Sequence, residues 1–186
     1  MKRIGITGSV ASGKSTAGKI LGKRGPVFSA DNIVKKLYAQ NKFKKFISKK
    51  LKIENHYNIK SLIKKRILRD RTFFINLEKI IHPLVRKEMA NFAEKHKNKK
   101  FTFFEIPLLV ESRLMKKFDK IFFIKAKRSL RLKRFKKKGG DKALFNILNR
   151  KQFSEKMKAK HCDYIINNEK NLNNLKKNLL NVLKKI

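Results

Sequence analysis

The stretch GSVASGKS, residues 8–15, restricts the fold of this chain more than any other feature. It fits the phosphate-binding pattern G-x-x-x-x-G-K-[ST], and it lies between the apolar run RIGIT and the helical stretch KSTAGKIL. Gly8 and Gly13 allow the backbone to curl with its N–H groups pointing inward. The positive end of the following helix adds to this cradle for phosphate groups. The pattern therefore predicts a strand, a phosphate-binding loop and a helix, in that order.

Side chains in this loop indicate a nucleoside triphosphate as the ligand. Lys14 provides a positive charge for the β- and γ-phosphates, the Ser15 hydroxyl is a ligand for Mg²⁺, and Thr16 can reach the α-phosphate. We therefore predict a nucleoside triphosphate as a co-substrate, Mg²⁺ as the cofactor with Ser15 as its metal-binding residue, and a catalytic role for Lys14. The residues predicted to bind this nucleotide, which is ATP if the family resemblance described below holds, are Gly8, Ala11, Ser12, Gly13, Lys14, Ser15 and Thr16.

Five short β-rich runs recur along the chain, and most are continuously apolar. Continuous apolar runs are typical of strands that are buried on both faces of a parallel sheet. Helical stretches separate the runs, which favours crossover helices and an α/β fold of three layers with a five-stranded parallel sheet. The runs are RIGIT (3–7), PVFS (26–29), FTFFEI (101–106), KIFFIK (120–125) and DYIIN (163–167).

Residues 41–100 have helical patterns and no strong strand, so we expect a helical insertion between the second and third strands. Within it, HPLVRKEMANFAEKH is predicted to be a helix with Pro83 in its first turn, where proline is favoured. The polar run 95–100 is expected to be the return loop.

A second helical region, residues 126–159, is basic and is broken by the stretch KKKGGDK. Asp141 is a candidate N-cap for the helix that follows. This pattern fits a mobile helical lid, and it fits an ordinary connection between two strands equally well. We divide a single domain, 1–186, into a nucleotide-binding core (1–40, 101–125 and 160–186), the insertion (41–100) and the lid with its adjoining helix (126–159).

The chain is strongly basic, with 51 Lys and Arg residues against 13 Asp and Glu residues and a net charge of +38. Such a field attracts polyanions, but the cations are scattered along the chain, which favours a solvated surface. Cys162 is the single cysteine, which suits a reducing cytosol, and the pair His161–Cys162 is too small for a metal site. With no signal peptide or membrane span in the sequence, we expect a cytoplasmic protein without a membrane partner.

The phosphate-binding loop does not identify the group that accepts the phosphoryl group. A kinase needs a carboxylate to take the proton of the acceptor hydroxyl. Asp31 follows the second β run, at the sheet edge where ligands of open α/β sheets bind. Asp31 is therefore a candidate base, although a cap for a helix beginning near Asn32 is a compatible interpretation.

Four separated stretches, taken together, resemble the dephospho-coenzyme A kinase family. The combination of IIHPLV with IPLLVE is specific, and the tail matches the family's pattern of an Asp before the last strand and an Asn after it. The stretches are GITGSVASGKST, SADNIVKKLY, LEKIIHPLVRKEM and EIPLLVES, followed by the tail KHCDYIINNEKNL.

The resemblance implies ATP-dependent phosphorylation of the ribose 3′-hydroxyl of dephospho-coenzyme A, which gives coenzyme A and ADP in the last step of coenzyme A synthesis. It implies that Asp31 is the catalytic base, that Arg134 is a lid arginine that reaches ATP, and that Asn168 lies near the adenine. It assigns the insertion to the acceptor and residues 126–159 to a lid. The acceptor-binding residues that it implies are Asp31, His82, Pro83, Arg86, Pro107, Leu108 and Glu111.

Some of these residues have simpler interpretations. His82 could be a helix N-terminal residue, Glu111 a solvated or salt-bridged residue, and Arg134 one of many surface cations. Glu105, at the end of a β run, either orders Mg²⁺ through water or is structural.

The chain also departs from the family pattern at two places. Ser29 replaces the first of two aspartates, and Lys138 with Gly139 replaces an arginine and an acidic residue in the lid. Lysine lacks the bidentate fork of arginine, so Lys137, Lys138 or Arg131 is left to compensate.

Two other functions fit parts of the sequence. One is another small P-loop kinase, such as one that acts on nucleoside monophosphates, although no analogue of IPLLVE is expected there. The other is a nucleic-acid-binding ATPase, which the net charge suggests, but the basic stretches contain no recognisable nucleic-acid-binding signature. We therefore expect ATP and dephospho-coenzyme A as partners and no specific nucleic acid, and the sequence leaves the oligomeric state undefined.

Overall fold

In the computed structural model the described residues are 1–53 and 58–186, apart from the side chains at positions 60, 64, 68 and 71. The described chain forms two compact units. We call residues 1–29 with 96–186 the core unit, and residues 30–95 the helical unit. The predicted insertion, 41–100, overlaps the helical unit, which also includes the helix at residues 30–39.

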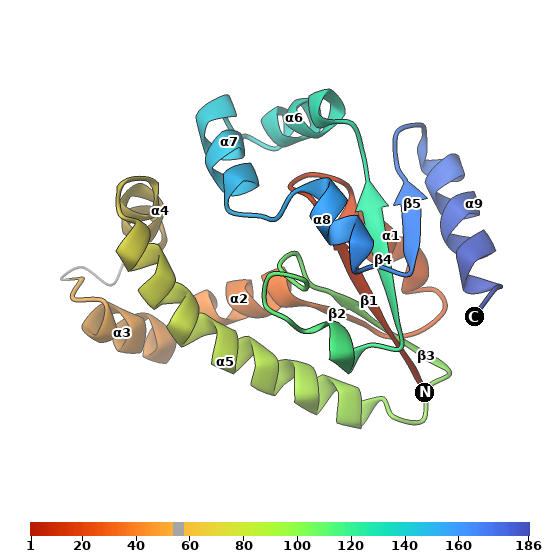
Figure 1. Ribbon diagram of the computed structural model, residues 1–186. Coiled ribbons are helices and arrows are strands. Elements are labelled where there is room, and N and C mark those ends of the chain that lie inside the picture. Colours follow the sequence, from red (N-terminus) through yellow and green to blue (C-terminus); the bar gives the residue numbers. More distant parts are fainter. Residues whose placement is uncertain (54–57) are drawn as a thin grey trace. The chain divides into compact units, whose positions relative to one another are not determined.

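The core unit is built on a parallel sheet, which has five strands in the described part of the chain (Figure 1). The strand order is β2-β3-β1-β4-β5, and every neighbouring pair is parallel. Each strand lies on one of the β runs predicted from sequence, which confirms the expected α/β class. The strands are β1 (Lys2–Gly8), β2 (Val27–Ser29), β3 (Phe101–Glu105), β4 (Lys120–Lys125) and β5 (Tyr164–Asn167).

Strand register brings the carboxyl ends of neighbouring strands together at one edge of the sheet. Glu105, the last residue of β3, pairs with Ser29 of β2 and with Ile6 of β1. The phosphate-binding loop leaves β1 at Gly8, whose partner on the other side is Ile124 of β4. The carboxyl ends of these strands therefore surround the loop, which is where open α/β sheets bind ligands.

Helices α1 (Lys14–Leu21) and α9 (Leu172–Leu183) cover one face of the sheet. The opposite face carries the segment 106–118, which includes the 3₁₀ helix η1 (Met115–Lys117). A Cβ atom at Gly5 would lie 2.6 Å from Leu109, so glycine allows this segment to pack closely on β1. The core between sheet and helices consists of Ile4, Ile6, Ala17, Leu21, Phe101, Phe103, Phe122, Ile124, Ile166, Leu175, Leu179 and Leu183.

Three short helices connect β4 to β5. They are α6 (Arg128–Lys137), α7 (Lys142–Arg150) and α8 (Glu155–Lys160). The predicted break lies between α6 and α7, and the Asp141 carboxylate accepts a hydrogen bond of 2.7 Å from the Leu144 N–H. The prediction that Asp141 caps the second helix is therefore confirmed. Ser154 caps α8 in the same way.

The helical unit contains α2 (Ala30–Ala39), α3 (Asn41–Lys50), α4 (Ile59–Arg69) and α5 (Arg71–Lys95). Its helices are amphipathic and bury their apolar faces against one another, because an isolated short helix is not stable in water. Its core is separate from that of the sheet. The buried residues of this core are Tyr38, Phe43, Ile47, Leu51, Ile59, Ile63, Phe73 and Leu77.

The predicted position of Pro83 in a first helical turn is wrong, because α5 runs through it without a break. A proline inside a helix leaves the carbonyl four residues earlier, at Lys79, without its usual donor. The helix starts earlier because the Asp70 carboxylate accepts a hydrogen bond of 2.8 Å from the Phe73 N–H. Burial of Phe73 and Leu77 then offsets a cost of about 3 kcal/mol.

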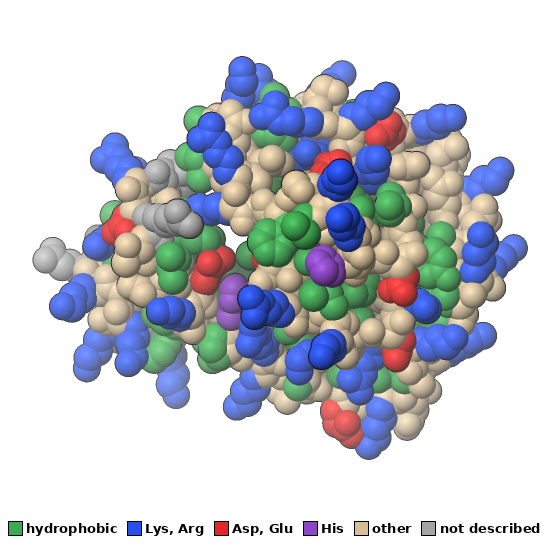
Figure 2. All heavy atoms as spheres, in the orientation of Figure 1, with side chains coloured by type: hydrophobic (Ala, Val, Ile, Leu, Met, Phe, Trp, Pro, Cys, Tyr) green, Lys and Arg blue, Asp and Glu red, His purple; other side chains and the backbone are tan. Residues whose placement is uncertain are grey.

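The surface is dominated by cations. Figure 2 shows Lys and Arg side chains scattered across the visible face, with few acidic side chains among them. This distribution favours the interpretation of the +38 charge as a solvated surface. In the ranges that the structure describes, no helix has the length and apolar character needed to cross a bilayer.

Candidate active site

The phosphate-binding loop has a curled backbone that requires glycine at two positions. Gly8 has a φ of +153° and Gly13 a φ of +103°, and a Cβ atom at Gly13 would lie only 2.1 Å from Asn168 Nδ2. The curl is closed by a hydrogen bond of 3.1 Å from the Ser12 N–H to the Ser9 carbonyl. Ala11 also has a positive φ, of 56°. The loop thus has the tight curve that its sequence predicts.

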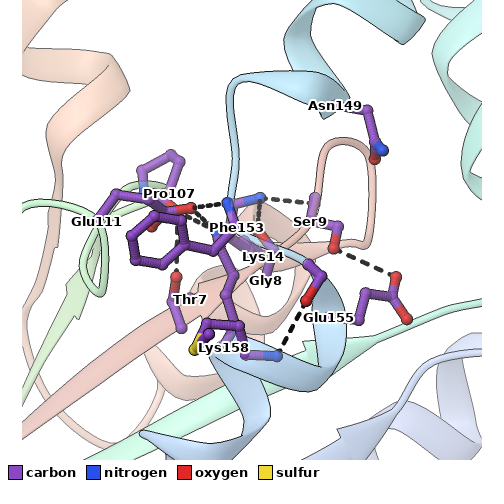
Figure 3. Close-up of polar contacts among 12 residues, drawn as sticks. Thr7, Gly8, Ser9, Lys14, Pro107, Glu111, Asn149, Phe153, Glu155 and Lys158 are labelled. Atoms are coloured by element: carbon purple, nitrogen blue, oxygen red, sulfur yellow. Dashed lines mark hydrogen bonds and ion pairs between the residues drawn. The ribbon is translucent and has the colours of Figure 1, made fainter.

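Lys14 points back over this loop. Its side chain is buried, and Nζ donates to the carbonyl oxygens of Gly8 at 3.0 Å and Ser9 at 2.9 Å (Figure 3). These contacts hold the ammonium group above the curve of the backbone. A phosphate group bound by the loop would therefore meet a positive charge that is already in position.

Ser15, the first residue after Lys14, is bound to a carboxylate from a neighbouring strand. Its hydroxyl donates a hydrogen bond of 2.6 Å to Glu105 Oε1, and Glu105 is only 4% exposed. A hydroxyl beside a carboxylate provides the oxygen ligands that Mg²⁺ prefers, so these residues fit a magnesium site. A purely structural carboxylate at this buried position would also need such a donor, so the contact is compatible with both interpretations of Glu105.

Two residues predicted to contact ATP meet on the outer side of the loop. Asn168 Nδ2 donates to the Ser12 carbonyl at 2.8 Å, and Arg134 Nη1 donates to the same oxygen at 3.5 Å. Arg134 Nη2 also donates to the Asn168 carbonyl at 3.0 Å. Arg134 is half-buried, so its interpretation as one of many surface cations is not supported.

The predicted acceptor segment, Pro107 to Glu111, is tied to the strand that leads into the loop. The Thr7 hydroxyl, one residue before Gly8, donates to the Pro107 carbonyl at 3.1 Å. Lys158 Nζ donates to that carbonyl at 2.9 Å and lies 2.9 Å from Glu111 Oε1. Glu111 is therefore a salt-bridge partner and is largely buried, with its side chain 12% exposed.

Another buried cation, Arg131, joins the loop to the three connecting helices. Its Nη1 atom donates to the Val10 carbonyl at 3.3 Å and to Asn149 Oδ1 at 2.9 Å, and its Nη2 atom lies 3.0 Å from Glu155 Oε1. Glu155 also accepts a hydrogen bond of 3.2 Å from the Ser9 hydroxyl. Burial lowers the pKa of Arg131, and the charge of Glu155 opposes this effect.

Four of the predicted acceptor-binding residues, Asp31, His82, Pro83 and Arg86, lie in the helical unit. Asp31 is exposed in the first turn of α2, which begins at Ala30, one residue before it. A carboxylate there is favoured by the helix dipole, so Asp31 can stabilise α2 without being its N-cap. The interpretation of Asp31 as the cap of a helix that begins near Asn32 is therefore wrong, and its role as the catalytic base stays a prediction.

His82 lies in the interior of α5, so the interpretation of this residue as helix N-terminal is wrong. Its Nε2 atom is 3.9 Å from Glu78 Oε1. Burial and the positive charge of Arg86 lower the pKa of His82. The ring is therefore neutral near pH 7. Pro83 and Arg86 are exposed on the same helix.

Comparison with known proteins identifies the family. Residues 2–174 of the chain match the model of a family described as dephospho-CoA kinase. The chain belongs to the dephospho-CoA kinase family. Members of this family catalyse the last step of coenzyme A synthesis, so the protein is a kinase, and the resemblance seen in the sequence is confirmed.

Individual dephospho-CoA kinases align with the chain from end to end. The protein from Bartonella quintana is 31% identical over 192 residues, covering 100% of this chain and 98% of its own length. The protein from Rickettsia bellii is 33% identical over 188 residues, covering 96% of this chain and 98% of its own length. A crystal structure of a Thermus thermophilus protein matches with a TM-score of 0.78 and 25% identity, covering 100% of this chain and 97% of that one.

Sequence reasoning missed three residues that hold the parts of this site together. Ser9 carries no distinctive signal inside the loop pattern. Glu155 follows Ser154 at the start of a short helix, and a helix start alone indicates only a cap. Lys158 is one of many lysines in the sequence. The one signal that sets it apart from the others is its position one helical turn after Glu155.

Proposed function

We propose that the protein transfers the γ-phosphoryl group of ATP to the ribose 3′-hydroxyl of dephospho-coenzyme A. One observation supports this most directly. The hydrogen bond from Thr7 to Pro107 ties the strand that carries the phosphate-binding loop to the start of the segment PLLVE. In a chain of this family, that contact joins the donor side to the predicted acceptor side.

The donor site consists of the loop and the cations around it. The loop backbone binds the phosphates of ATP, and the Lys14 ammonium group neutralises charge on the transferring phosphoryl group. Arg134 provides a further positive charge, and Asn168 lies beside the adenine. Fixed cations are needed because ATP and the acceptor are both polyanions, and their repulsion would otherwise oppose the encounter.

We infer that Mg²⁺ is held by the Ser15 hydroxyl, with Glu105 acting through water. When bound, the ion neutralises charge on the phosphates of ATP. Glu105 fixes the orientation of the Ser15 hydroxyl through their 2.6 Å hydrogen bond. Because Glu105 is buried, its carboxylate has few other conformations to adopt.

The acceptor reacts through its 3′-hydroxyl, and we assign Asp31 as the base. Asp31 takes the hydroxyl proton as the 3′-oxygen forms a bond to the γ-phosphorus, and the bond from that phosphorus to the β,γ-bridging oxygen breaks. ADP leaves with the bridging oxygen. His82, Pro83 and Arg86 bind the acceptor from the helical unit, and the predicted contacts from the core unit are Pro107, Leu108 and Glu111.

Water competes with the ribose hydroxyl as an acceptor. We infer that α6 and α7 close over bound ATP as a lid and exclude water from the site. We further propose that the enzyme acts in the cytoplasm, with ATP and dephospho-coenzyme A as its partners and without a specific nucleic acid or membrane partner.

Mass spectrometry tests the proposed function directly. The purified protein is incubated with ATP, Mg²⁺ and dephospho-coenzyme A, and we expect coenzyme A to accumulate with one ADP formed for each molecule. A parallel reaction with nucleoside monophosphates tests the other kinase class. Product with a nucleoside monophosphate and none with dephospho-coenzyme A would overturn the proposal.

A further inference from the structure

Helix α8 contacts both sides of the site, through two residues one helical turn apart. Glu155 contacts Ser9 in the phosphate-binding loop and Arg131 in α6. Lys158 contacts Pro107 and Glu111 in the acceptor segment. Residues three apart in sequence lie on the same face of a helix, so one face of α8 contacts the phosphate-binding loop and the acceptor segment (Figure 3).

Lys158 is a fully buried cation, with 0% of its side chain exposed. Burial of an ammonium group costs several kcal/mol unless charged and polar partners replace its water. Its Nζ atom contacts the Pro107 carbonyl and Glu111 Oε1, at 2.9 Å each, and both lie in the segment 107–111. The Glu111 carboxylate is held in turn by a hydrogen bond of 3.0 Å from the Phe153 N–H. These contacts fix the buried Lys158 ammonium group in one position.

The Pro107 carbonyl accepts two hydrogen bonds. One comes from Lys158 and the other from Thr7, the residue before Gly8. The start of the acceptor segment is therefore held between α8 and the strand that leads into the phosphate-binding loop. In addition, Glu111 Oε2 is buried and has no hydrogen-bond partner among the described residues.

We propose that Lys158 is a positioning residue that fixes the segment 107–111 beside the phosphate-binding loop, so that the acceptor is held in line with the phosphoryl group. The inference rests on the proposed acceptor role of this segment. Lys158 itself touches neither substrate. It acts through Pro107 and Glu111, so its loss affects the acceptor more than ATP.

The test compares Lys158→Met with Lys156→Met. The first variant removes the charge and all three donors but keeps a side chain of similar length, and the second makes the same change at an exposed position of α8. Initial rates give KM for dephospho-coenzyme A and kcat, and calorimetry gives the Kd of ATP. For Lys158→Met we expect KM for dephospho-coenzyme A to rise at least tenfold, while the Kd of ATP stays within twofold of wild type.

The control and the rescue define the remaining outcomes. Lys156→Met should keep both constants within twofold, and Lys158→Arg, which keeps the charge, should recover part of the acceptor KM. An acceptor KM within twofold of wild type for Lys158→Met would overturn the proposal. Equal weakening of ATP and acceptor binding would also overturn it, because it indicates general loss of structure.

If near-ultraviolet circular dichroism shows that Lys158→Met is unfolded, Lys158→Gln takes its place under the same criteria. Failure of the Met, Gln and Arg variants to fold would assign Lys158 to stability alone and so reject the positioning role. Absence of coenzyme A formation by the wild-type enzyme is a separate result, and it contradicts the proposed function.

Discussion

The Ser15 hydroxyl and the Glu105 carboxylate, 90 residues apart in sequence, are joined by a hydrogen bond of 2.6 Å. The sheet explains this contact. Glu105 ends β3 beside Ile6 of β1, and the loop that leaves β1 carries Ser15 back to the same edge. Strand register therefore brings together two residues whose side-chain oxygens were each predicted to help hold Mg²⁺.

Replacement of Glu105 by Gln tests that relationship. The amide can still accept a hydrogen bond from Ser15, but it has lost the negative charge that favours a cation. Residues that support a metal ligand commonly contribute 10- to 100-fold to metal affinity. We therefore expect the Mg²⁺ concentration for half-maximal rate to rise about 10- to 100-fold, as measured by Mg²⁺ titration at fixed total ATP.

Glu88→Gln provides the matched control, because it makes the same change at an exposed position of α5. Its Mg²⁺ dependence should equal that of wild type. An unchanged Mg²⁺ requirement in the Glu105 variant would show that this carboxylate only supports the fold.

Replacement of Asp31 by Asn tests the proposed base. The amide cannot accept the hydroxyl proton, and general base catalysis typically contributes about 10²- to 10⁴-fold. We expect kcat to fall by about that factor, while KM for dephospho-coenzyme A changes little. Steady-state rates at saturating ATP measure both constants.

Asp70→Asn is the control in the same unit, because asparagine can still cap α5 at that position. It should retain the turnover of wild type. If Asp31→Asn also retained it, Asp31 would not be the base, and its role would be limited to the start of α2.

Gly13→Ala tests the shape of the phosphate-binding loop. At a φ of +103°, a Cβ atom would lie 2.1 Å from Asn168 Nδ2, far inside contact distance. The loop or Asn168 must move, so we expect ATP affinity to fall more than tenfold, as measured by calorimetry. Gly139→Ala is the comparison. Gly139 has a φ of +79°, but a Cβ atom added there would have no heavy atom of the described chain within 4 Å, apart from those of its own neighbours in sequence.

Gly139→Ala has backbone strain without a clash, so it should lower the free energy of unfolding by about 1 kcal/mol. Its ATP affinity should remain within twofold of wild type. Similar ATP affinities for the two variants would contradict the argument that close approach of Asn168 requires glycine at position 13.

The sequence was sufficient to predict the sheet because each strand is a short, continuously apolar run between helices. The loop at Gly8–Ser15 was equally clear, since its spacing has a specific chemical purpose. Pro83 was misplaced because a proline signal was weighed without the Asp70 cap and the buried Phe73 before it. Local preference was overridden there by packing in the helical unit.

Charged partners far apart in sequence could not be predicted. Lys158 resembles every other lysine in a chain with 51 cations, and only the fold reveals that it is buried against Pro107 and Glu111. The contact of Glu155 with Arg131 likewise depends on how α6 and α8 pack. Such pairs carry no spacing pattern, because the partners lie on different elements.

Cys162 allows a test of the environment behind Lys158, because it is the single cysteine and can be labelled selectively. Burial raises the pKa of its thiol from 9.0 to about 12, and the nearby charge of Lys158 opposes this effect while Asp163 and Glu111 reinforce it. The thiolate is the reactive form. Iodoacetamide should therefore alkylate the native protein at least tenfold more slowly at pH 9 than the urea-unfolded chain.

The pH dependence separates this effect from simple shielding. The native rate should keep rising about tenfold per pH unit from pH 8 to 10, whereas the rate for the unfolded chain should level off above pH 9. Because the native pKa exceeds the unfolded value, the thiol contributes stability that is fully present below pH 9 and is lost as pH rises from 9.0 towards about 12. Cys162→Ala should lack that loss in urea titrations. A native rate that levels off near pH 9 would show that Cys162 is not buried as described.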